Sequence, residues 1–267
     1  MALAQASEAA SGCTAYVTLE PCAHQSARGP ACADLLVSAA PARVVAAITD
    51  PDPRTAGKGI ARLREAGISV ETGVLEDAAR YGLAGFLSRI ERGRPHVTLK
   101  LATSLDGQIA LANGSSRWIT GEAARAHVHL ERSRCDAILV GAGTVRTDAS
   151  KLDVRLPGLE QRSPRRIMLG SGDPPAGWAA IRSLQEIAGL DCNRLYVEGG
   201  AQTASAFLKA GLVDRLMLYR APILTGAGKA CLGDIGLSQL DDAQDCWTLL
   251  DERRLGKDRL EVYEAVR

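Results

Sequence analysis

The feature that most constrains the fold is a regular alternation of short, β-branched apolar runs with segments of helical periodicity. In the first part of the chain the runs "TAYVTL", "RVVAAIT" and "ISVETGV" are typical of strands, and "ACADLLVSAA" and "GKGIARLREAG" are typical of the helices between them. These helices end near Gly or Pro, as helix C-termini commonly do. The alternation predicts an α/β chain built on a mixed, largely parallel sheet.

A domain boundary is indicated near the first third of the chain. The long helical pattern "EDAARYGLAGFLSRIERG" stops at Gly93, and a new strand pattern begins directly after Pro95. We therefore expect one domain over residues 1–93 and another over residues 94–267. Further strands are predicted at "CDAILVGAG", "RRIMLGS", "NRLYVEGG" and "RLMLYRAPILTG", with helices at "GEAARAHVHLERSR" and "AQTASAFLKAG".

Composition excludes several classes of protein. Hydrophobic residues make up 46% of the chain and charged residues 24%, as in ordinary globular proteins. A net charge of +1 predicts no general attraction to nucleic acid or to a membrane surface. The seven cysteines lack the dense spacing of a secreted disulfide scaffold, and no apolar run reaches the roughly eighteen residues of a membrane span, so we expect a cytoplasmic protein.

Three turns that follow predicted strands are candidate ligand sites. The stretch "GSSRWITG" could hold a phosphate or an amide, although its composition alone favours a surface loop around a buried Trp118. Gly141 and Gly143 permit close approach of a nucleotide, but a plain structural turn is the more frequent explanation. In "LYVEGGAQTASAFL", Glu198 ends a strand and two glycines lead into a helix whose free N–H groups suit a pyrophosphate; alternatively, Glu198 only caps that helix.

Arginine residues give a further local signal. Arg132 and Arg134 end a predicted helix, and Arg146 and Arg155 flank "TDASKLDV". Planar guanidinium groups suit a phosphate monoester. Since most arginines in proteins are simply solvated, composition alone assigns none of these four to a ligand.

The stretch "AYVTLEPCAHQ" contains half of a zinc site of the kind found in nucleobase deaminases. In those enzymes a Pro-Cys and a later Cys combine with an upstream His-x-Glu, which provides the third ligand and the proton-shuttling carboxylate. Cys22 follows Pro21, and Cys32 lies ten positions further on, but residues 1–21 contain no histidine. Cys22 and Cys32 are therefore two of the three ligands that such a zinc site requires.

Taken in order, these motifs resemble those of the bifunctional riboflavin-biosynthesis deaminase/reductase family. The resemblance covers most of the chain and is carried by "YVTLEPCAH", "DPDPRTAGKGIARLREAGISV", "GRPHVTLKLATSLDGQIA", "SRWITGEAA", "DAILVGAGTVRTD", "LYVEGGAQTASAF" and "APILTG". It implies a cytidine-deaminase-like first domain that hydrolyses a pyrimidine amine. It also implies a dihydrofolate-reductase-like second domain that reduces the ribosyl group of a phosphoribosylamino-pyrimidine to ribityl with NADPH.

The resemblance further implies site residues, with Glu198 and Asp148 in catalytic roles. The positions that resemble NADP contacts are Ala102, Trp118, Thr144, Asp148, Ser171, Gly200, Ala201, Gln202, Thr203, Ala204, Ser205 and Ala206. The positions that resemble substrate contacts are Ser116, Arg132, Leu152, Arg155 and Glu198. Because positioning dominates such a reduction, we expect Arg132 and Arg155 to grip the phosphate and Glu198 to orient the ribose.

The same resemblance leads us to expect an incomplete deaminase domain. In the family the His-x-Glu lies just before the strand that corresponds to "AYVTL", and the opening "MALAQA" resembles sequence that follows that motif. The histidine that corresponds to His24 is not a ligand in the family. We therefore expect a homo-oligomeric NADPH-dependent reductase with an N-terminally truncated, inactive deaminase portion. Two alternatives remain open: a first domain that serves only as a structural or dimerisation module, and a nucleotide-binding protein without turnover.

Overall fold

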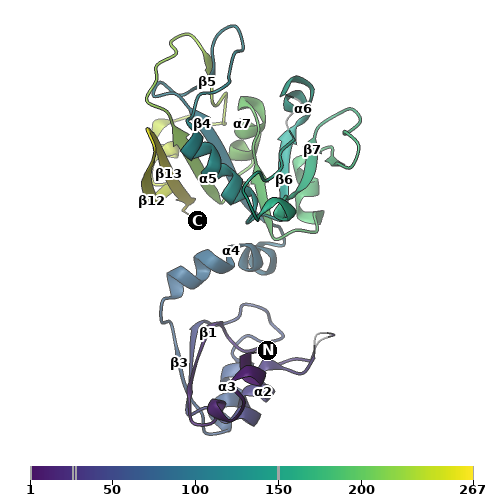
Figure 1. Cartoon of the computed structure of the whole chain (residues 1–267), viewed down its shortest axis with the longest axis vertical. Coiled ribbons are helices and arrows are strands. Elements are labelled where there is room, and N and C mark those ends of the chain that lie inside the picture. The colour runs from purple at the N-terminus through teal and green to yellow at the C-terminus, as the bar shows by residue number, and fades with distance from the viewer. Residues whose placement is uncertain (1, 26, 28, 149–150, 267) are drawn as a thin grey trace. The chain divides into compact units, whose positions relative to one another are not determined.

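The computed structural model describes residues 2–25, 27, 29–148 and 151–266. It divides into two compact units, Met1–Gly93 and Arg94–Arg267 (Figure 1). Among the described residues, no helix combines the length and the apolar character that crossing a membrane requires.

The first unit is built on a parallel three-stranded sheet in the order β1-β2-β3. Its elements are α1 (Ala2–Ala6), the 3-10 helix η1 (Ser7–Ala10), β1 (Thr14–Leu19), α2 (Cys32–Ala39), β2 (Arg43–Ile48), α3 (Lys58–Glu65), β3 (Ser69–Thr72) and α4 (Glu76–Arg92). Leu36 of α2 and Leu63 of α3 share a buried cluster with Val44 of β2. Leu87 of α4 lies in a second buried cluster with Ile48. The central strand β2 is therefore enclosed by helices.

Glu20 holds the loop between β2 and α3 in place. Its side chain is buried, and its Oε1 accepts hydrogen bonds from the backbone N–H groups of Gly59 (2.9 Å) and Ile60 (3.1 Å) at the start of α3. Its Oε2 accepts hydrogen bonds from the N–H groups of Asp50 (3.1 Å) and Gly57 (2.9 Å). One carboxylate thus satisfies donors that the first turn of a helix would otherwise leave unpaired.

The second unit contains an eight-stranded sheet in the order β12-β13-β10-β4-β9-β6-β7-β8. Its strands are β4 (His96–Thr103), β6 (Ala137–Gly141), β7 (Arg165–Leu169), β8 (Ala179–Ile181), β9 (Arg194–Val197), β10 (Arg215–Arg220), β12 (Trp247–Leu255) and β13 (Asp258–Ala265). The strands from β10 to β8 are parallel, whereas β13 runs antiparallel to β10 and β12. The predicted α/β chain with a mixed, largely parallel sheet is confirmed.

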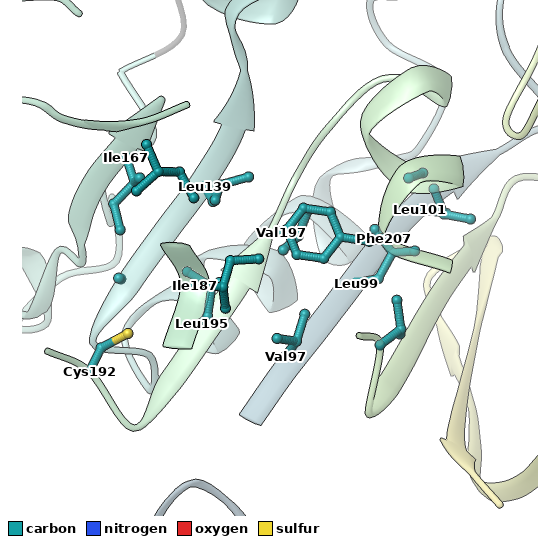
Figure 2. Close-up of a cluster of buried hydrophobic side chains, with 14 residues drawn as sticks. Val97, Leu99, Leu101, Leu139, Ile167, Ile187, Cys192, Leu195, Val197 and Phe207 are labelled. Carbon is teal, nitrogen blue, oxygen red and sulfur yellow. The ribbon is translucent and has the colours of Figure 1, made fainter. Parts of the chain in front are cut away.

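Helices cover both faces of this sheet. The remaining elements are α5 (Glu122–Arg132), α6 (Ala142–Asp148), α7 (Ala201–Lys209), the 3-10 helices η2 (Glu160–Arg162), η3 (Leu184–Gly189) and η4 (Leu240–Ala243), and a separate ribbon of β5 (Gln108–Ala110) with β11 (Lys229–Ala230). Val128 of α5 is buried with Tyr196, whereas Phe207 of α7 is buried with Val197 and Leu99 (Figure 2). Since neighbouring strand residues point to opposite faces, α5 and α7 lie on opposite sides of the sheet.

Two parts of the second unit differ from the sequence-based expectation. The strand predicted over "RLMLYRAPILTG" ends at Arg220, shortly before Pro222, which has no N–H to donate to a ladder. The C-terminal hairpin β12–β13 was not predicted, because exposed charged residues interrupt the apolar alternation of β12. Its two-residue turn places Gly256 at the first central position with φ of 66°, a conformation that glycine adopts without strain.

The Glu20 contacts lead to a stability prediction for the first unit. In Glu20→Gln an amide NH2 group faces backbone donors, so at least one buried N–H loses its acceptor. We expect the first unit to lose about 3 kcal/mol of unfolding free energy, measured by urea denaturation. Glu65→Gln, an exposed change at the end of α3, is the matched control. Equal urea midpoints for the two variants would contradict the role of Glu20.

Candidate active site

A cleft of about 1030 Å³ opens at the carboxyl ends of the parallel strands in the second unit. Lys100 and Ala102 reach it from β4, Glu198 from the residue after β9, Gly141 from the end of β6 and Leu169 from the end of β7. Ligands of open α/β sheets bind outside these strand ends, where loops from neighbouring strands diverge. The cleft is therefore the candidate active site of this unit.

Most residues that the resemblance assigns to cofactor and substrate line this cleft. They are Ala102, Ser116, Trp118, Arg132, Thr144, Leu152, Arg155, Ser171, Glu198, Gly200, Ala201, Gln202 and Thr203. Three others, Ala204, Ser205 and Ala206, lie further along α7 and are not among the described lining residues. Ser205 is buried, and its Oγ accepts a hydrogen bond of 2.8 Å from the N–H of Gly233. Asp148 is the last residue of α6, and its side chain lies outside the described part of the chain.

An ion cluster lies at the centre of the cleft. Arg132, at the end of α5, donates from Nε to Glu198 Oε1 at 2.6 Å and from Nη2 to Glu198 Oε2 at 2.9 Å. Lys100 Nζ lies 3.5 Å from the same Oε2. The side chains of Arg132 and Glu198 are 8% and 9% exposed, so water screens this bidentate pair only weakly. The cluster brings together residues from β4, α5 and the end of β9.

The two cations keep Glu198 ionised. Burial alone would raise the pKa of this carboxyl group, but the charges of Lys100 and Arg132 and their hydrogen bonds lower it from its ordinary 4.5 to about 2. Burial also opposes the charge on Arg132, but the Glu198 carboxylate raises the pKa of that guanidinium above its ordinary value. At neutral pH the cleft therefore holds one fixed carboxylate between two fixed cations.

The two arginines expected at the phosphate have different surroundings. Besides Glu198, Arg132 donates from Nη1 to the carbonyl oxygen of Asp153 at 3.0 Å, so three of its donors are engaged. The Arg155 side chain is 62% exposed, and its Nε lies 3.4 Å from Asp153 Oδ1. Arg132 thus serves first to fix Glu198, while the Arg155 guanidinium remains accessible from the cleft.

Glycines allow α7 to pack closely on the end of β6. A Cβ at Gly141 would lie 2.4 Å from Thr203 Oγ1, and a Cβ at Gly199 would lie 2.4 Å from Thr203 Cβ. By contrast, a Cβ at Gly143 would meet nothing within 4 Å, and one at Gly200 would meet only Thr144 Oγ1, at 3.9 Å. Gly141 and Gly199 are therefore needed for packing, whereas Gly143 and Gly200 border open space in the cleft.

The start of α7 offers donors to a ligand. The N-cap residue of α7 is Gly200, which has no side chain that could accept hydrogen bonds from the first turn. Gly200, Ala201, Gln202 and Thr203 line the cleft, so the unpaired N–H groups of a nine-residue helix lie beside open space. Such an arrangement suits a pyrophosphate. The alternative in which Glu198 only caps this helix is wrong, because the carboxylate of Glu198 binds Arg132 and Lys100.

Trp118 is exposed, so the interpretation of its loop around a buried tryptophan is wrong. Its side chain is 65% exposed and lines the cleft. The guanidinium carbon of Arg125 lies 4.7 Å from the centre of the indole ring, within the range of a cation–π interaction. Arg125 also donates to the carbonyl oxygen of Thr120 at 2.6 Å, which fixes the guanidinium under the ring.

The residues of the cleft that the sequence did not indicate include Lys100, His129 and Arg125. Lys100 is not predicted as a site residue, because a lysine within an apolar strand pattern is typical of a side chain that faces solvent. His129 is not among the predicted site residues, yet its Nδ1 lies 3.0 Å from the carbonyl oxygen of Asp153 and it lines the cleft. Arg125 lies in a helix pattern five residues after Thr120, and only the loop conformation brings it to Trp118.

The two cysteines of the half zinc site lie together in the first unit. The N–H of Cys32 donates to Cys22 Sγ at 3.2 Å. His24 Nδ1 lies 3.2 Å from Thr55 Oγ1, so this ring nitrogen contacts a hydroxyl group. Within the described residues, no group of three or more His, Cys, Asp or Glu side chains could hold a metal ion. The residues present thus do not fit a complete zinc site.

Sequence comparisons link the chain to known proteins. The RibD C-terminal domain family matches residues 95–174 and 180–258. The riboflavin biosynthesis protein RibD of Escherichia coli is 38% identical over 292 residues, which cover 91% of this chain and 79% of that protein. The residues matched by the family model include all three members of the ion cluster, Lys100, Arg132 and Glu198.

Solved structures give the same relationship. RibD of Acinetobacter baumannii has a TM-score of 0.88 at 36% identity, covering 100% of this chain and 84% of that one. A Thermotoga maritima protein described as a diaminohydroxyphosphoribosylaminopyrimidine deaminase/5-amino-6-(5-phosphoribosylamino)uracil reductase has a TM-score of 0.80 at 28% identity, covering 94% of this chain and 79% of that one. These similarities confirm the expected α/β fold with a reductase domain of the dihydrofolate-reductase type.

The charge of Glu198 leads to a pH prediction. Because folding lowers its pKa from 4.5 to about 2, its stabilising contribution is complete above pH 4.5 and is lost as the pH falls toward 2. Near neutral pH we expect Glu198→Gln to lower the unfolding free energy of the second unit by about 3 kcal/mol. Urea denaturation from about pH 6 to about pH 3 should show the difference between wild type and variant shrinking. A difference that stays constant over this range would contradict the ion cluster.

Proposed function

Since the chain belongs to the RibD family of riboflavin biosynthesis proteins, we propose that its second unit reduces 5-amino-6-(5-phosphoribosylamino)uracil to the ribityl product with NADPH. The observation that carries the proposal is the ion cluster of Lys100, Arg132 and Glu198, which lies in the cleft beside the open start of α7. The cluster offers a site for a polar sugar, and the helix offers a site for a dinucleotide.

The cleft has the features that NADPH requires. Gly143 and Gly200 border open space, and the first N–H groups of α7 suit the pyrophosphate. The proposed contacts are Ala102, Trp118, Thr144, Asp148, Ser171 and the start of α7 at Gly200, Ala201, Gln202 and Thr203. Ala204, Ser205 and Ala206 would act by supporting that helix start rather than by touching the cofactor. When bound, NADPH would supply a hydride to the sugar.

The residues around Glu198 suit the other half of the reaction. Reduction of the opened, imine form of the sugar adds a hydride to C1′ and a proton to the adjoining nitrogen. Lys100 Nζ carries protons in the cleft and is held by Glu198 at 3.5 Å, so we assign it to that nitrogen or its neighbouring hydroxyl groups. The remaining lone pairs of Glu198 would accept hydrogen bonds from the ribose hydroxyl groups, and Arg132 keeps the carboxylate oriented.

The phosphate of the substrate is assigned chiefly to Arg155. Its guanidinium is exposed, and Arg155 lines the cleft, as does Leu152. Leu152 itself is 4% exposed and has a φ of 51°, a backbone conformation that non-glycine residues rarely adopt and that is found often at functional sites. Ser116, which is exposed and also lines the cleft, would contact the pyrimidine portion.

The first unit is proposed to be a deaminase-like domain without deaminase activity in this chain. Cys22 and Cys32 lie together, but the described residues provide no third ligand, and residues 1–21 contain no His-x-Glu. The alternative of a dimerisation module is supported by Tyr16, which is 72% exposed on β1, a strand that pairs only with β2 among the described strands. We propose a homo-oligomer, located in the cytoplasm as its free cysteines suggest.

Turnover of the purified chain tests the reductase. The chain should oxidise NADPH when it is supplied with the deaminated pyrimidine ribosyl phosphate. The loss of NADPH absorbance measures this oxidation. We expect Arg155→Ala to raise the KM for the pyrimidine about thirtyfold with kcat little changed, because the phosphate contact is equal in ground and transition states. Arg162→Ala, an exposed change in η2 outside the cleft, is the control. A folded chain without turnover would contradict the proposal, and ammonia release from the aminated precursor would contradict the inactive first unit.

A further inference from the structure

The segment that carries Arg155 has neither helix nor strand over residues 151–155. Leu152 and Val154 are buried, at 4% and 2% exposure, whereas Arg155 is exposed. Leu152 belongs to the same buried cluster as Val128 of α5. Because no helix or sheet ladder holds this backbone, its position depends on the side chains that bind its peptide groups.

Two side chains of α5 bind one carbonyl group of this segment. Arg132 Nη1 donates to the carbonyl oxygen of Asp153 at 3.0 Å, and His129 Nδ1 lies 3.0 Å from the same oxygen. The two residues are three positions apart, so they lie on the same face of the helix. Next along the chain, the N–H of Val154 donates to Ser163 Oγ at 3.0 Å. The backbone around Asp153 is therefore held by named side chains rather than by regular structure.

The imidazole of His129 is neutral at neutral pH. Burial lowers its pKa below the ordinary 6.5, and the charges of Arg132 and Arg155 lower the pKa further. A neutral ring carries one N–H, and a carbonyl oxygen can only accept, so the contact with Asp153 places the proton on Nδ1. The backbone nitrogen of Arg155 lies 3.4 Å from the same Nδ1. The ring thus lies against both peptide groups that flank Val154.

His129 can be changed without removing a charge from the ion cluster. Arg132 also donates to Glu198, at 2.6 Å and 2.9 Å, so its replacement would disturb the polar centre of the cleft. The Nδ1 atom of His129, by contrast, contacts the backbone next to Arg155. A substitution at His129 therefore tests the position of the Arg155 segment separately from the charge of Glu198.

We propose that His129 is a positioning residue that holds the backbone of Arg155 so that its guanidinium meets the phosphate of the substrate. This inference rests on the proposed function for the identity of that phosphate. A backbone that is fixed in advance loses less conformational freedom when the ligand binds. Since His129 acts through Arg155, its effect on phosphate binding must vanish when the Arg155 side chain is absent.

Binding of ribose 5-phosphate, the phosphosugar portion of the proposed substrate, tests this role without turnover. Isothermal titration of the full chain should show about fivefold weaker binding by His129→Ala, the effect of one lost hydrogen bond. His129→Asn should restore the affinity to within about twofold, because its amide nitrogen lies close to the position of Nδ1. In the Arg155→Ala background, His129→Ala should cause no further loss. Additive losses would overturn the proposal.

His127→Ala is the matched control for a general loss of stability in α5. His127 is half-buried on the same helix, and its Nδ1 lies 2.9 Å from Tyr219 Oη. We expect both histidine-to-alanine variants to unfold at lower urea concentrations than the wild type. The affinity of His127→Ala for ribose 5-phosphate should nevertheless stay within about twofold of the wild type. Equal losses of affinity in the two variants would show that loosening of α5 is sufficient, and would overturn the positioning role.

Steady-state kinetics separate this proposal from the proposed reaction. His129→Ala should raise the KM for the pyrimidine about fivefold, with kcat and the KM for NADPH unchanged. If the wild type turns over but His129→Ala binds ribose 5-phosphate as the wild type does, the reductase stands and the positioning role is refuted. Weaker binding that disappears in the Arg155→Ala background supports the role even if no NADPH is oxidised. A wild type that neither turns over nor binds ribose 5-phosphate refutes both.

Discussion

The Glu198 carboxylate is buried at the end of β9, and it can remain charged there only because Arg132 and Lys100 neutralise it. An uncompensated buried charge would cost several kcal/mol, so the three side chains must be placed together or not at all. Their placement depends on the parallel sheet, which brings the ends of β4 and β9 side by side, and on α5, which ends against the same face. The ion pairs that form the polar centre of the cleft thus also connect β4, α5 and the end of β9.

Close backbone packing shapes the rest of the cleft. Gly141 and Gly199 let Thr203 approach the end of β6, so the first turn of α7 opens directly beside the ion cluster. The same strand order carries the cleft onward to α6 and the loop after β7, where Arg146 lines it. Under the proposed function, a dinucleotide and a phosphorylated sugar would share this one groove.

Much of this arrangement was predictable because it depends on local pattern. The alternation of strands and helices predicted the parallel sheet, and Glu198 followed by two glycines marked the end of β9 and the start of α7. The features that could not be predicted depend on contacts between residues far apart in the sequence. Arg132 binds Glu198, 66 positions away, so the sequence could not distinguish its role in fixing Glu198 from phosphate binding. Lys100 was missed because its neighbours in β4 are apolar, and the C-terminal hairpin because charges on its exposed face hide the period of its strands.

We propose that the carboxylate charge of Glu198 organises the reacting sugar. The most direct measurement is the single-turnover rate of NADPH oxidation by Glu198→Gln at saturating cofactor and pyrimidine, with NADPH affinity determined separately. We predict a rate at least about a hundredfold below that of the wild type, as for loss of a preorganised charged group, while the Kd for NADPH changes little. A rate within about threefold of the wild type, from a variant that is folded at the pH of the assay, would contradict it.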